Sequence, residues 1–370
     1  MGKRFIISGG GTGGHIFPAI SIANALKQSL PDAEILFVGA IGRMEMEKVP
    51  AAGYPIEGLP VSGFDRKNML KNVKVLINLV KSLLKARNII YKFKPDAAIG
   101  VGGYASGPLL RAASACGVPT VIQEQNSYAG ITNKLLAAKA SCICVAYDEM
   151  EQFFPADKIV KTGNPIRQDL LLVKPKSQVA YDYFKFSPDK KTLLIVGGSL
   201  GARTINQSVI AHLKSMSESG IQVIWQTGKF YIEEVRKAYE PFKNANILVT
   251  DFVTRMDYAY AVADVVISRA GASSISELCL LGKPTILVPS PNVAEDHQTK
   301  NAMALVKKDA AVMITDATAR EQLIPVTLNL IADDAKCHQL TENILKLAEN
   351  NASGRIVNEI LKLLNDKRGV

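Results

Sequence analysis

The segment most informative about the fold class is Phe5-Ile6-Ile7-Ser8-Gly9-Gly10-Gly11-Thr12-Gly13-Gly14-His15. Three apolar residues run into a cluster of glycines, and a segment with helical periodicity follows. Glycine permits positive φ and close backbone approach, and the first turn of a helix offers N–H groups to an anion. The pattern therefore predicts a strand, a ligand-binding loop and a helix that begins near His15.

A strand followed by a glycine cluster occurs three times, in residues 5–14, 97–107 and 193–201. The first and third occurrences open the two halves of the chain. Short apolar runs alternate with helical segments throughout, which is typical of α/β units with parallel sheets. We therefore expect an α/β fold with two Rossmann-like domains whose parallel sheets face each other across a cleft, and ligands at the carboxyl ends of the strands.

The apolar runs also indicate where the domains divide. We expect an N-terminal domain over residues 1–163 and a C-terminal domain over 164–353, because a polar stretch at 174–178 separates two sets of strands. A final helix within 354–370 could pack back on the first domain. The predicted strands are 5–8, 34–38, 97–101, 120–123, 142–145, 193–196, 222–225, 246–249, 264–268, 285–288 and 311–314.

Length and composition limit the class of protein. A length of 370 residues favours two domains over one, and a composition of 48% apolar and 21% charged residues argues against global disorder. No apolar run approaches the ~18 residues of a membrane-spanning helix. The five cysteines contain no Cys-x-x-Cys pair, so we expect neither a disulfide framework nor a zinc site, and a reducing cytoplasm fits best.

The net charge of +10 is concentrated in one segment. Residues 66–94 contain nine basic residues and no acidic one, and Leu70, Val73, Ile77, Val80 and Leu84 form an apolar seam at helical spacing. A basic amphipathic helix favours an anionic membrane surface. The alternative is a solvated helix whose apolar seam packs on its own sheet. Nucleic acid is disfavoured, because the only aromatic residues lie at the far end of the segment.

His15 is the main candidate for acid–base chemistry. A histidine at a helix N-terminus has its neutral form favoured by the helix dipole, which suits a general base near neutral pH. The alternative is a histidine that only hydrogen-bonds its own loop. Gly9, Gly11 and Gly14 also satisfy G-x-G-x-x-G, but Gly39-Ala40 stands where a dinucleotide-binding protein needs an acidic residue. A nicotinamide-dependent oxidoreductase is therefore the weaker alternative.

Further segments could hold a diphosphate. Residues 102–108 and 197–203 repeat the glycine pattern, and Arg269-Ala270-Gly271-Ala272-Ser273 follows a predicted strand and opens a helix. Ser274 and Glu277 have the spacing of an N-terminal capping box, which gives Glu277 a purely structural explanation. No Asp-x-Asp occurs in the chain, so helix dipoles with arginine or serine groups, and no metal, would stabilise a leaving diphosphate.

Several motifs, taken together and in this order, resemble one family over essentially the whole chain. These are Gly10-Gly11-Thr12-Gly13-Gly14-His15 with Phe17-Pro18, Gly102-Gly103-Tyr104 with Ser106-Gly107-Pro108, Glu124-Gln125-Asn126, Gly163-Asn164-Pro165-Ile166-Arg167, Gly197-Gly198-Ser199 with Gly201-Ala202-Arg203, and Asp296-His297-Gln298 with Asn301-Ala302. The family is that of the bacterial N-acetylglucosaminyltransferases of peptidoglycan synthesis. The resemblance implies the GT-B glycosyltransferase fold and inverting transfer of N-acetylglucosamine from UDP to undecaprenyl-diphosphate-linked N-acetylmuramyl-pentapeptide.

The resemblance also implies roles for individual residues. His15 would be the catalytic base, and Gly103, Tyr104 and Ser106 would lie near the acceptor. The donor-binding positions would be Thr12, Gly13, Gly14, Asn126, Arg167, Ser199, Val253, Ala272, Ser273, Ser274, Ile275, Ser276, Glu277 and Gln298. Val253 takes the place of an aliphatic residue beside uracil, and Glu277 would bind the ribose. Gln123 departs from the family, in which many members have histidine there.

The resemblance implies no cofactor, no nucleic-acid partner, and a peripheral location at the cytoplasmic face of the membrane through residues 66–94. Two alternatives from other classes stay open beside it. One is a different UDP-sugar transferase that acts on a membrane lipid such as diacylglycerol. The other is a non-catalytic nucleotide sensor docked on the membrane.

Overall fold

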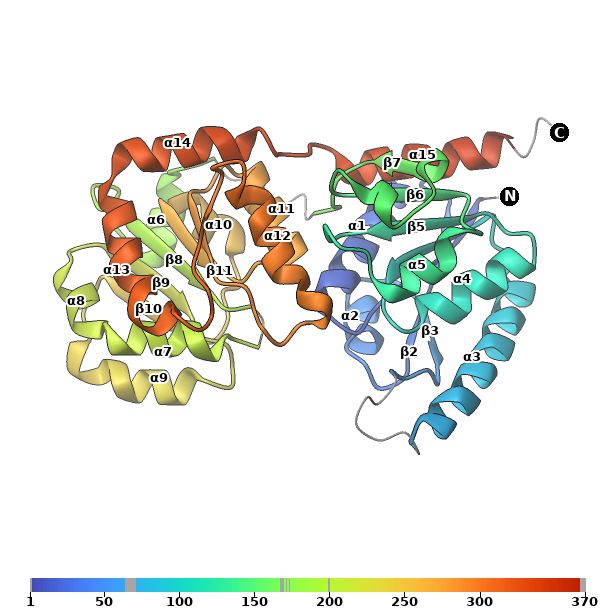
Figure 1. The fold of residues 1–370 in the computed structure, drawn as a ribbon, viewed down its shortest axis with the longest axis horizontal. Coiled ribbons are helices and arrows are strands. Elements are labelled where there is room, and N and C mark those ends of the chain that lie inside the picture. Colours follow the sequence, from blue (N-terminus) through green and yellow to red (C-terminus); the bar gives the residue numbers. More distant parts are fainter. Residues whose placement is uncertain are drawn as a thin grey trace. The chain divides into compact units, whose positions relative to one another are not determined.

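A computed structural model describes residues 2–63, 71–166, 170, 172, 174–198 and 200–366 (Figure 1). The chain divides into two compact units. Unit 1 comprises Met1–Arg167 and Glu349–Val370, and unit 2 comprises Gln168–Ala348. Unit 2 is therefore a continuous segment inserted between two parts of unit 1.

Unit 1 is built on a parallel sheet with strand order β3-β2-β1-β4-β5-β6-β7. The order reverses direction between β1 and β4, which is where Rossmann-like sheets bind ligands at their carboxyl ends. The strands are β1 Arg4–Gly9, β2 Glu34–Ala40, β3 Ile56–Leu59, β4 Ala97–Gly102, β5 Thr120–Glu124, β6 Cys142–Val145 and β7 Ile159–Lys161.

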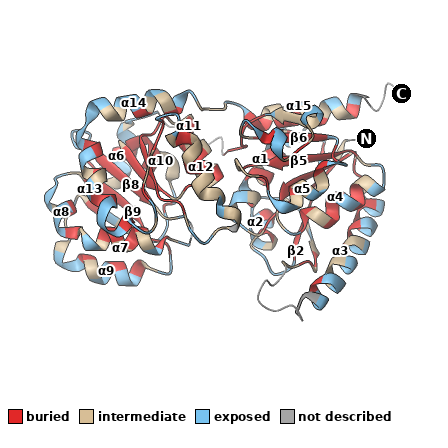
Figure 2. Ribbon diagram, in the orientation of Figure 1, coloured by how far each residue is buried: buried red, intermediate tan, exposed pale blue. Residues whose placement is uncertain are grey.

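Helices cover both faces of this sheet, because its strands are apolar on both sides (Figure 2). In β1, Ile6 packs with α3, α4 and α5, whereas Phe5 and Ile7 pack with α1 and α15. The helices are α1 Gly13–Ser29, α2 Glu45–Ala51, α3 Lys71–Phe93, α4 Ser106–Ala115, α5 Ile131–Ala137 and α15 Ala352–Asp366, with short 3-10 turns η1 Met150–Gln152 and η2 Ala156–Lys158.

Helix α15 belongs to the core of unit 1 although unit 2 precedes it in the chain. Ile356, Val357, Ile360 and Leu364 are buried with residues of α1 and the sheet. Helix α15 therefore completes the cover over one face of the sheet of unit 1.

Unit 2 repeats the same architecture with strand order β10-β9-β8-β11-β12-β13, again all parallel. In β8, Leu194 packs towards α6, α10, α11 and α12, whereas Leu193 and Ile195 pack towards α7, α9 and α13. The strands are β8 Thr192–Val196, β9 Gln222–Gln226, β10 Ile247–Thr250, β11 Val265–Ser268, β12 Thr285–Leu287 and β13 Val312–Met313.

The helices of unit 2 surround this sheet (Figure 1). They are α6 Gln178–Phe184, α7 Arg203–Ala211, α8 Leu213–Glu218, α9 Ile232–Tyr239, α10 Met256–Val262, α11 Ala272–Leu280, α12 His297–Val306, α13 Ala319–Ala332 and α14 Asp334–Leu345, with 3-10 turns η4 Glu240–Phe242 and η5 Ala294–Asp296. Among the described residues of the whole chain, no helix is both long enough and apolar enough to cross a membrane.

Candidate active site

Two glycine loops of unit 1 touch each other at the carboxyl end of the sheet. The loop after β1 contains Gly10, whose N–H donates to the carbonyl oxygen of Gly102 at 3.3 Å. Gly103 has φ +90°, and a Cβ atom there would lie 2.4 Å from the carbonyl oxygen of Gly10. Only glycine fits this approach without a backbone shift. The sequence motifs 9–14 and 102–107 therefore form one structure.

His15 lies between these two loops, in the first turn of α1. Its Nδ1 is 3.0 Å from the carbonyl oxygen of Gly10. A carbonyl oxygen can only accept a hydrogen bond, so Nδ1 carries the proton in the neutral ring and Nε2 keeps its lone pair. A Cβ atom at Gly102 would lie 2.8 Å from Nε2, which shows how closely the second loop approaches that edge of the ring. The geometry suits a group that accepts a proton at Nε2.

Thr12, Gly13 and Gly14 form the turn from the loop into α1. Thr12 has extended backbone angles at the N-cap, and its carbonyl oxygen accepts from His15 N at 3.1 Å and Ile16 N at 3.2 Å. Within the described part of the chain, a Cβ atom at Gly14 would have the Thr12 hydroxyl as its nearest non-neighbouring contact, at 3.6 Å, so the backbone at Gly14 is open to approach. These residues present helix N–H groups at the carboxyl end of the sheet, as the anion-binding prediction requires.

A buried glutamate that sequence reasoning missed supports this loop. Glu45, at the start of α2, is 1% exposed and accepts from Gly11 N at 2.8 Å and Ala40 N at 3.0 Å. It stands five residues beyond the end of β2, without any glycine or histidine motif around it. No pattern in the sequence connects it to the loop; only the fold brings the two together.

A network of hydrogen-bonded amide side chains lies next to the loop that carries Asn126. Gln123, Gln125 and Asn164 are all buried; Gln123 Nε2 donates to Asn164 Oδ1 at 3.1 Å, and Asn164 Nδ2 to the carbonyl oxygen of Gln125 at 3.0 Å. Gln125 Nε2 also donates to the carbonyl oxygen of Val101 at 2.8 Å. The network joins β4, β5 and the segment after β7. Gln123 therefore supplies an amide hydrogen bond at the position where it departs from the resembled family.

Glu124 is the second functional candidate that sequence reasoning left without a role. It is buried and accepts from Asn126 N at 3.1 Å, Gly130 N at 3.0 Å and Asn133 Nδ2 at 2.8 Å. Its carboxylate therefore shapes the whole loop after β5 and holds Asn126 at the carboxyl end of the sheet.

The structure separates the three acceptor-side candidates. Gly103 lies at the contact between the two loops, and Tyr104 is 47% exposed, with Arg43 Cζ 6.0 Å from its ring centre. Ser106 is completely buried, and its hydroxyl lies 3.0 Å from the carbonyl oxygen of Ser8 and 2.9 Å from that of Gly102. The hydroxyl therefore ties β1 to the loop after β4, and the nearness of Ser106 to an acceptor stays a prediction.

In unit 2, the loop after β8 has the same tight construction. Gly201 has φ +83°, and a Cβ atom there would lie 2.1 Å from the carbonyl oxygen of Thr227. Gln226 Nε2 donates to the carbonyl oxygens of Gly198 at 2.9 Å and Asp251 at 3.1 Å. The loop is thereby fixed at the carboxyl end of β8. Two predicted site residues, Ser199 in this loop and Arg167, lie outside the described residues.

Helix α11 begins earlier than the capping-box interpretation requires. Its N-cap is Gly271, with extended backbone angles, and Ala272 is the first helical residue. Ser274 therefore lies inside the first turn, and among the described residues no side-chain cap hydrogen bond is made at the helix N-terminus. The capping box was a wrong prediction, because Gly271 is already extended after β11. The capping box therefore does not explain Glu277.

The residues at the start of α11 differ in side-chain burial and in hydrogen bonding. Ala272 and Ile275 are buried in the core, and Ser276 donates back to the carbonyl oxygen of Ala272 at 3.0 Å, so these three contribute backbone rather than side chains. Ser273 Oγ is buried and makes no hydrogen bond within the described part of the chain. A hydroxyl of that kind beside helix N–H groups suits an oxyanion.

The other three donor-side candidates are anchored in unit 2. Glu277 Oε2 accepts from the hydroxyl of Tyr260 at 3.1 Å, and Gln298 Oε1 accepts from Ser290 N at 2.9 Å. Val253 is only 5% exposed, because its side chain packs in the core with α6 and α10. Any contact of Val253 with a base would therefore use its backbone or a small edge of its side chain.

Arg269, which begins the motif after β11, has a structural role. Its Nη1 donates to Asp316 Oδ1 at 2.6 Å and to the carbonyl oxygens of Val288 and Pro289, both at 3.1 Å. Asp316 in turn accepts from the hydroxyl of Thr204 at 2.8 Å. Arg269 therefore braces the carboxyl ends of β11 and β12.

Solved structures with this architecture define the class. MurG from Acinetobacter baumannii is 28% identical and aligns over 97% of this chain and 99% of its own, with a TM-score of 0.78. The glycosyltransferase of kitacinnamycin shares the fold at 14% identity, with a TM-score of 0.73. The two Rossmann-like units with all-parallel sheets are those of a GT-B glycosyltransferase, as the sequence predicted.

Matches of protein-family models to the amino-acid sequence identify the family. The models of the glycosyltransferase family 28 N-terminal and C-terminal domains match residues 5–145 and 192–356. The chain belongs to glycosyltransferase family 28. A relative from Parabacteroides distasonis is 63% identical over 98% of this chain and 99% of its own length, and one from Porphyromonas gingivalis is 58% identical over 99% and 97%. Both are named UDP-N-acetylglucosamine--N-acetylmuramyl-(pentapeptide) pyrophosphoryl-undecaprenol N-acetylglucosamine transferase.

The resemblance drawn from the sequence motifs is thus confirmed. Membership of a glycosyltransferase family also sets aside the nicotinamide-dependent oxidoreductase and the non-catalytic nucleotide sensor as interpretations.

Proposed function

We propose that this protein transfers N-acetylglucosamine from UDP-N-acetylglucosamine to the C4 hydroxyl of undecaprenyl-diphosphate-linked N-acetylmuramyl-pentapeptide. The names of relatives that are 57–63% identical along almost their whole length support both substrates. The observation that carries the chemistry is the hydrogen bond from His15 Nδ1 to the carbonyl oxygen of Gly10. It leaves Nε2 as the proton-accepting nitrogen at the carboxyl end of a Rossmann-like sheet.

The donor is assigned mainly to unit 2. Helix α11 presents N–H groups of its first turn and the Ser273 hydroxyl, which suit the diphosphate, while Glu277 is anchored by Tyr260 and suits the ribose diol. The full set of proposed donor-binding residues is Thr12, Gly13, Gly14, Asn126, Arg167, Ser199, Val253, Ala272, Ser273, Ser274, Ile275, Ser276, Glu277 and Gln298.

The proposed reaction inverts the anomeric carbon. His15 Nε2 takes the proton of the acceptor C4 hydroxyl as its oxygen bonds to the anomeric carbon, from the face opposite UDP. The bond from that carbon to the β-phosphate oxygen breaks, and UDP leaves with the bonding electron pair. Helix N–H groups of α11, with Ser199 and Arg167, would stabilise the charge that develops on the diphosphate. Gly103 and Tyr104 would contact the acceptor.

The second part of the proposal is that α3 holds the enzyme on an anionic membrane surface. Val73, Ile77, Val80 and Leu84 are 51–64% exposed, so the apolar seam does not pack on its own sheet. A different stripe of α3 faces the core, formed by Val75, Ser82, Ala86, Ile89 and Ile90. The alternative interpretation, a solvated helix with its seam buried, is thereby wrong for these four residues.

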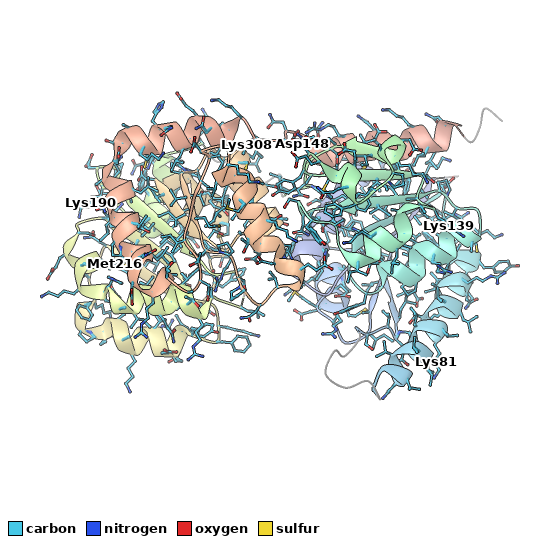
Figure 3. The ribbon with its side chains drawn as sticks, viewed as in Figure 1. Lys81, Lys139, Asp148, Lys190, Met216 and Lys308 are labelled. Atoms are coloured by element: carbon cyan, nitrogen blue, oxygen red, sulfur yellow. The ribbon has the colours of Figure 1, made fainter. Side chains whose placement is uncertain are left out.

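Basic side chains accompany the exposed seam. Lys74, Lys81, Lys85 and Arg87 are exposed on α3, and Figure 3 shows Lys81 projecting from the helix. An exposed apolar stripe bordered by cations is the composition that binds anionic lipid headgroups and inserts into the interface. Of the residues in this segment, Arg66, Lys67 and Leu70 lie outside the described part of the chain. The location proposed is peripheral, at the cytoplasmic face.

The test of the function is transfer of radiolabelled N-acetylglucosamine from UDP to a short-chain analogue of the lipid-linked muramyl peptide. UDP-N-acetylgalactosamine is the matched donor control, and diacylglycerol is the control acceptor for the remaining alternative of a different UDP-sugar transferase. We expect transfer only with the first donor and the muramyl acceptor. Transfer to diacylglycerol alone would refute the acceptor assignment and leave the glycosyltransferase class intact.

A further inference from the structure

One peptide group links Glu45 to His15. The carbonyl oxygen of Gly10 and the N–H of Gly11 belong to the same planar peptide unit. The oxygen accepts from His15 Nδ1 at 3.0 Å, and the N–H donates to Glu45 Oε2 at 2.8 Å. The order of groups is therefore carboxylate, peptide, imidazole.

The carboxylate is itself held in place. Its other oxygen, Oε1, accepts from Ala40 N at 3.0 Å, and the side chain is 1% exposed. A Cβ atom at Gly10 would lie 2.2 Å from Oε1, so the loop backbone rests directly on the carboxyl group. Two backbone N–H groups and the backbone of Gly10 therefore hold the carboxylate against the loop.

We propose that Glu45 is a positioning residue for glycosyl transfer, which fixes the orientation and the proton location of His15 through the peptide between Gly10 and Gly11. The inference rests on the proposed function of His15 as base. Glu45 takes no proton in the reaction and touches no substrate. Its role corresponds to that of an outer carboxylate that orients a histidine, with a peptide group inserted between them.

The physical basis is polarisation of the peptide. A negative charge on the N–H side draws the peptide dipole into line and increases the negative charge on the carbonyl oxygen. That oxygen then accepts more strongly from Nδ1–H, which favours the tautomer with the lone pair on Nε2. A neutral group at position 45 removes the contribution of the charge to this bias and leaves the less polarised carbonyl oxygen of Gly10 as the acceptor.

The first experiment reads the tautomer of His15 directly by nitrogen NMR of protein labelled with ¹⁵N-histidine at alkaline pH. The chain has four histidines, and the signals of His15 are identified by their loss in His15→Gln. We expect the Nδ1–H tautomer in the wild type and a larger fraction of the Nε2–H tautomer in Glu45→Gln. An unchanged tautomer in a folded Glu45→Gln protein overturns the proposal.

The second experiment is a double-mutant cycle in the transfer assay. Glu45→Gln should lower kcat about 10- to 100-fold and change KM for UDP-N-acetylglucosamine less than about twofold, as for loss of an outer carboxylate. In a His15→Gln background the same substitution should cost less than about threefold, because the group it positions is gone. Equal losses in both backgrounds would show a merely structural role and contradict the proposal.

Two further variants distinguish a specific effect of Glu45 from a general loss of folding. Glu45→Asp keeps the charge, so we expect it to retain the Nδ1–H tautomer and to lose less kcat than Glu45→Gln; a shift of tautomer as large as that of the glutamine variant contradicts the proposal. Asp96→Asn is the matched control, since Asp96 accepts from Arg4 N at 2.8 Å at the opposite end of β1. It should change neither the tautomer nor kcat.

The outcomes separate this inference from the function on which it rests. If His15→Gln retains near-normal turnover, the role of His15 as base fails, whatever the tautomer. If His15→Gln is inactive and Glu45→Gln leaves the tautomer unchanged, only the inference about Glu45 fails.

Discussion

His15 owes its proposed chemistry to one hydrogen bond, and a single substitution tests it. His15→Ala should lose about 10²–10⁴ in kcat, because general-base catalysis contributes on that order. UDP affinity should change little, since the ring is assigned to the acceptor proton and not to the nucleotide. Turnover and UDP titration on the same preparation measure both quantities. Near-normal turnover would remove His15 from the role of base.

Lys283 is a buried cation two residues before β12, at the amino end of that strand. Its Nζ donates to the carbonyl oxygen of Ala263 at 2.9 Å, and the side chain is almost fully buried. Burial, together with the nearby charge of Lys176, lowers the pKa of Lys283 from 10.5 to about 8, against the opposing effect of Asp264. The folded protein therefore binds this proton more weakly than the unfolded chain does.

The sign of the resulting pH dependence follows from linkage. Below pH 8 both states are protonated and the native state carries the whole cost of the buried charge. Between pH 8 and 10.5 only the unfolded state keeps the proton, so the free energy of unfolding should rise with pH. The rise should reach roughly 3 kcal/mol relative to Lys283→Met, given about 1.4 kcal/mol for each pKa unit. Urea unfolding of both proteins at several pH values measures it; parallel pH curves would contradict the assignment.

At the scale of the elements, α3 is the helix whose two faces the sequence could not assign. Its spacing of apolar residues allowed the seam to face either the sheet or the solvent. The structure buries Val75, Ser82, Ala86, Ile89 and Ile90, a stripe with smaller residues, and leaves the larger seam exposed. Burial depends on which neighbours the fold supplies, and periodicity alone does not contain that information.

The exposed seam gives a prediction for membrane binding. Replacing both Ile77 and Leu84 with glutamate should lower partition onto phosphatidylglycerol vesicles by at least about tenfold, because each change removes apolar contact and adds a repelled charge. Leu345→Glu on α14, which is 46% exposed, is the matched control and should bind as the wild type does. Undiminished binding of the double variant, with an unchanged unfolding midpoint, would contradict the assignment of α3.

Strands and loops differed in how far the sequence could predict them. The eleven predicted strands are all present, because buried parallel strands are continuous apolar runs. The edge strands β3 and β7 were missed, since Ile56–Leu59 and Ile159–Lys161 are short and partly polar. The glycine loops and His15 could be found by motif, whereas Glu45 and the start of α11 depend on contacts between distant segments.

At the scale of the whole molecule, unit 1 is completed by a helix that follows unit 2. Ile360 of α15 is fully buried among residues of α1 and the first sheet. Ile360→Ala should lower the free energy of unfolding by about 2–5 kcal/mol, the usual cost of a cavity in a packed core. Asn358→Ala, on the exposed side of the same helix, should stay within about 0.5 kcal/mol of the wild type. Denaturant unfolding compares the two; equal stabilities would show that the Ile360 side chain does not stabilise unit 1.

The insertion of unit 2 into unit 1 has a consequence for folding during synthesis on the ribosome. Translation delivers every strand of the first sheet early, but the helix that shields one of its faces emerges only after residues 168–348 have been made. During that interval, the nascent chain exposes an apolar surface that its own sequence cannot yet cover. A chain that stops before α15 would leave that surface uncovered after synthesis.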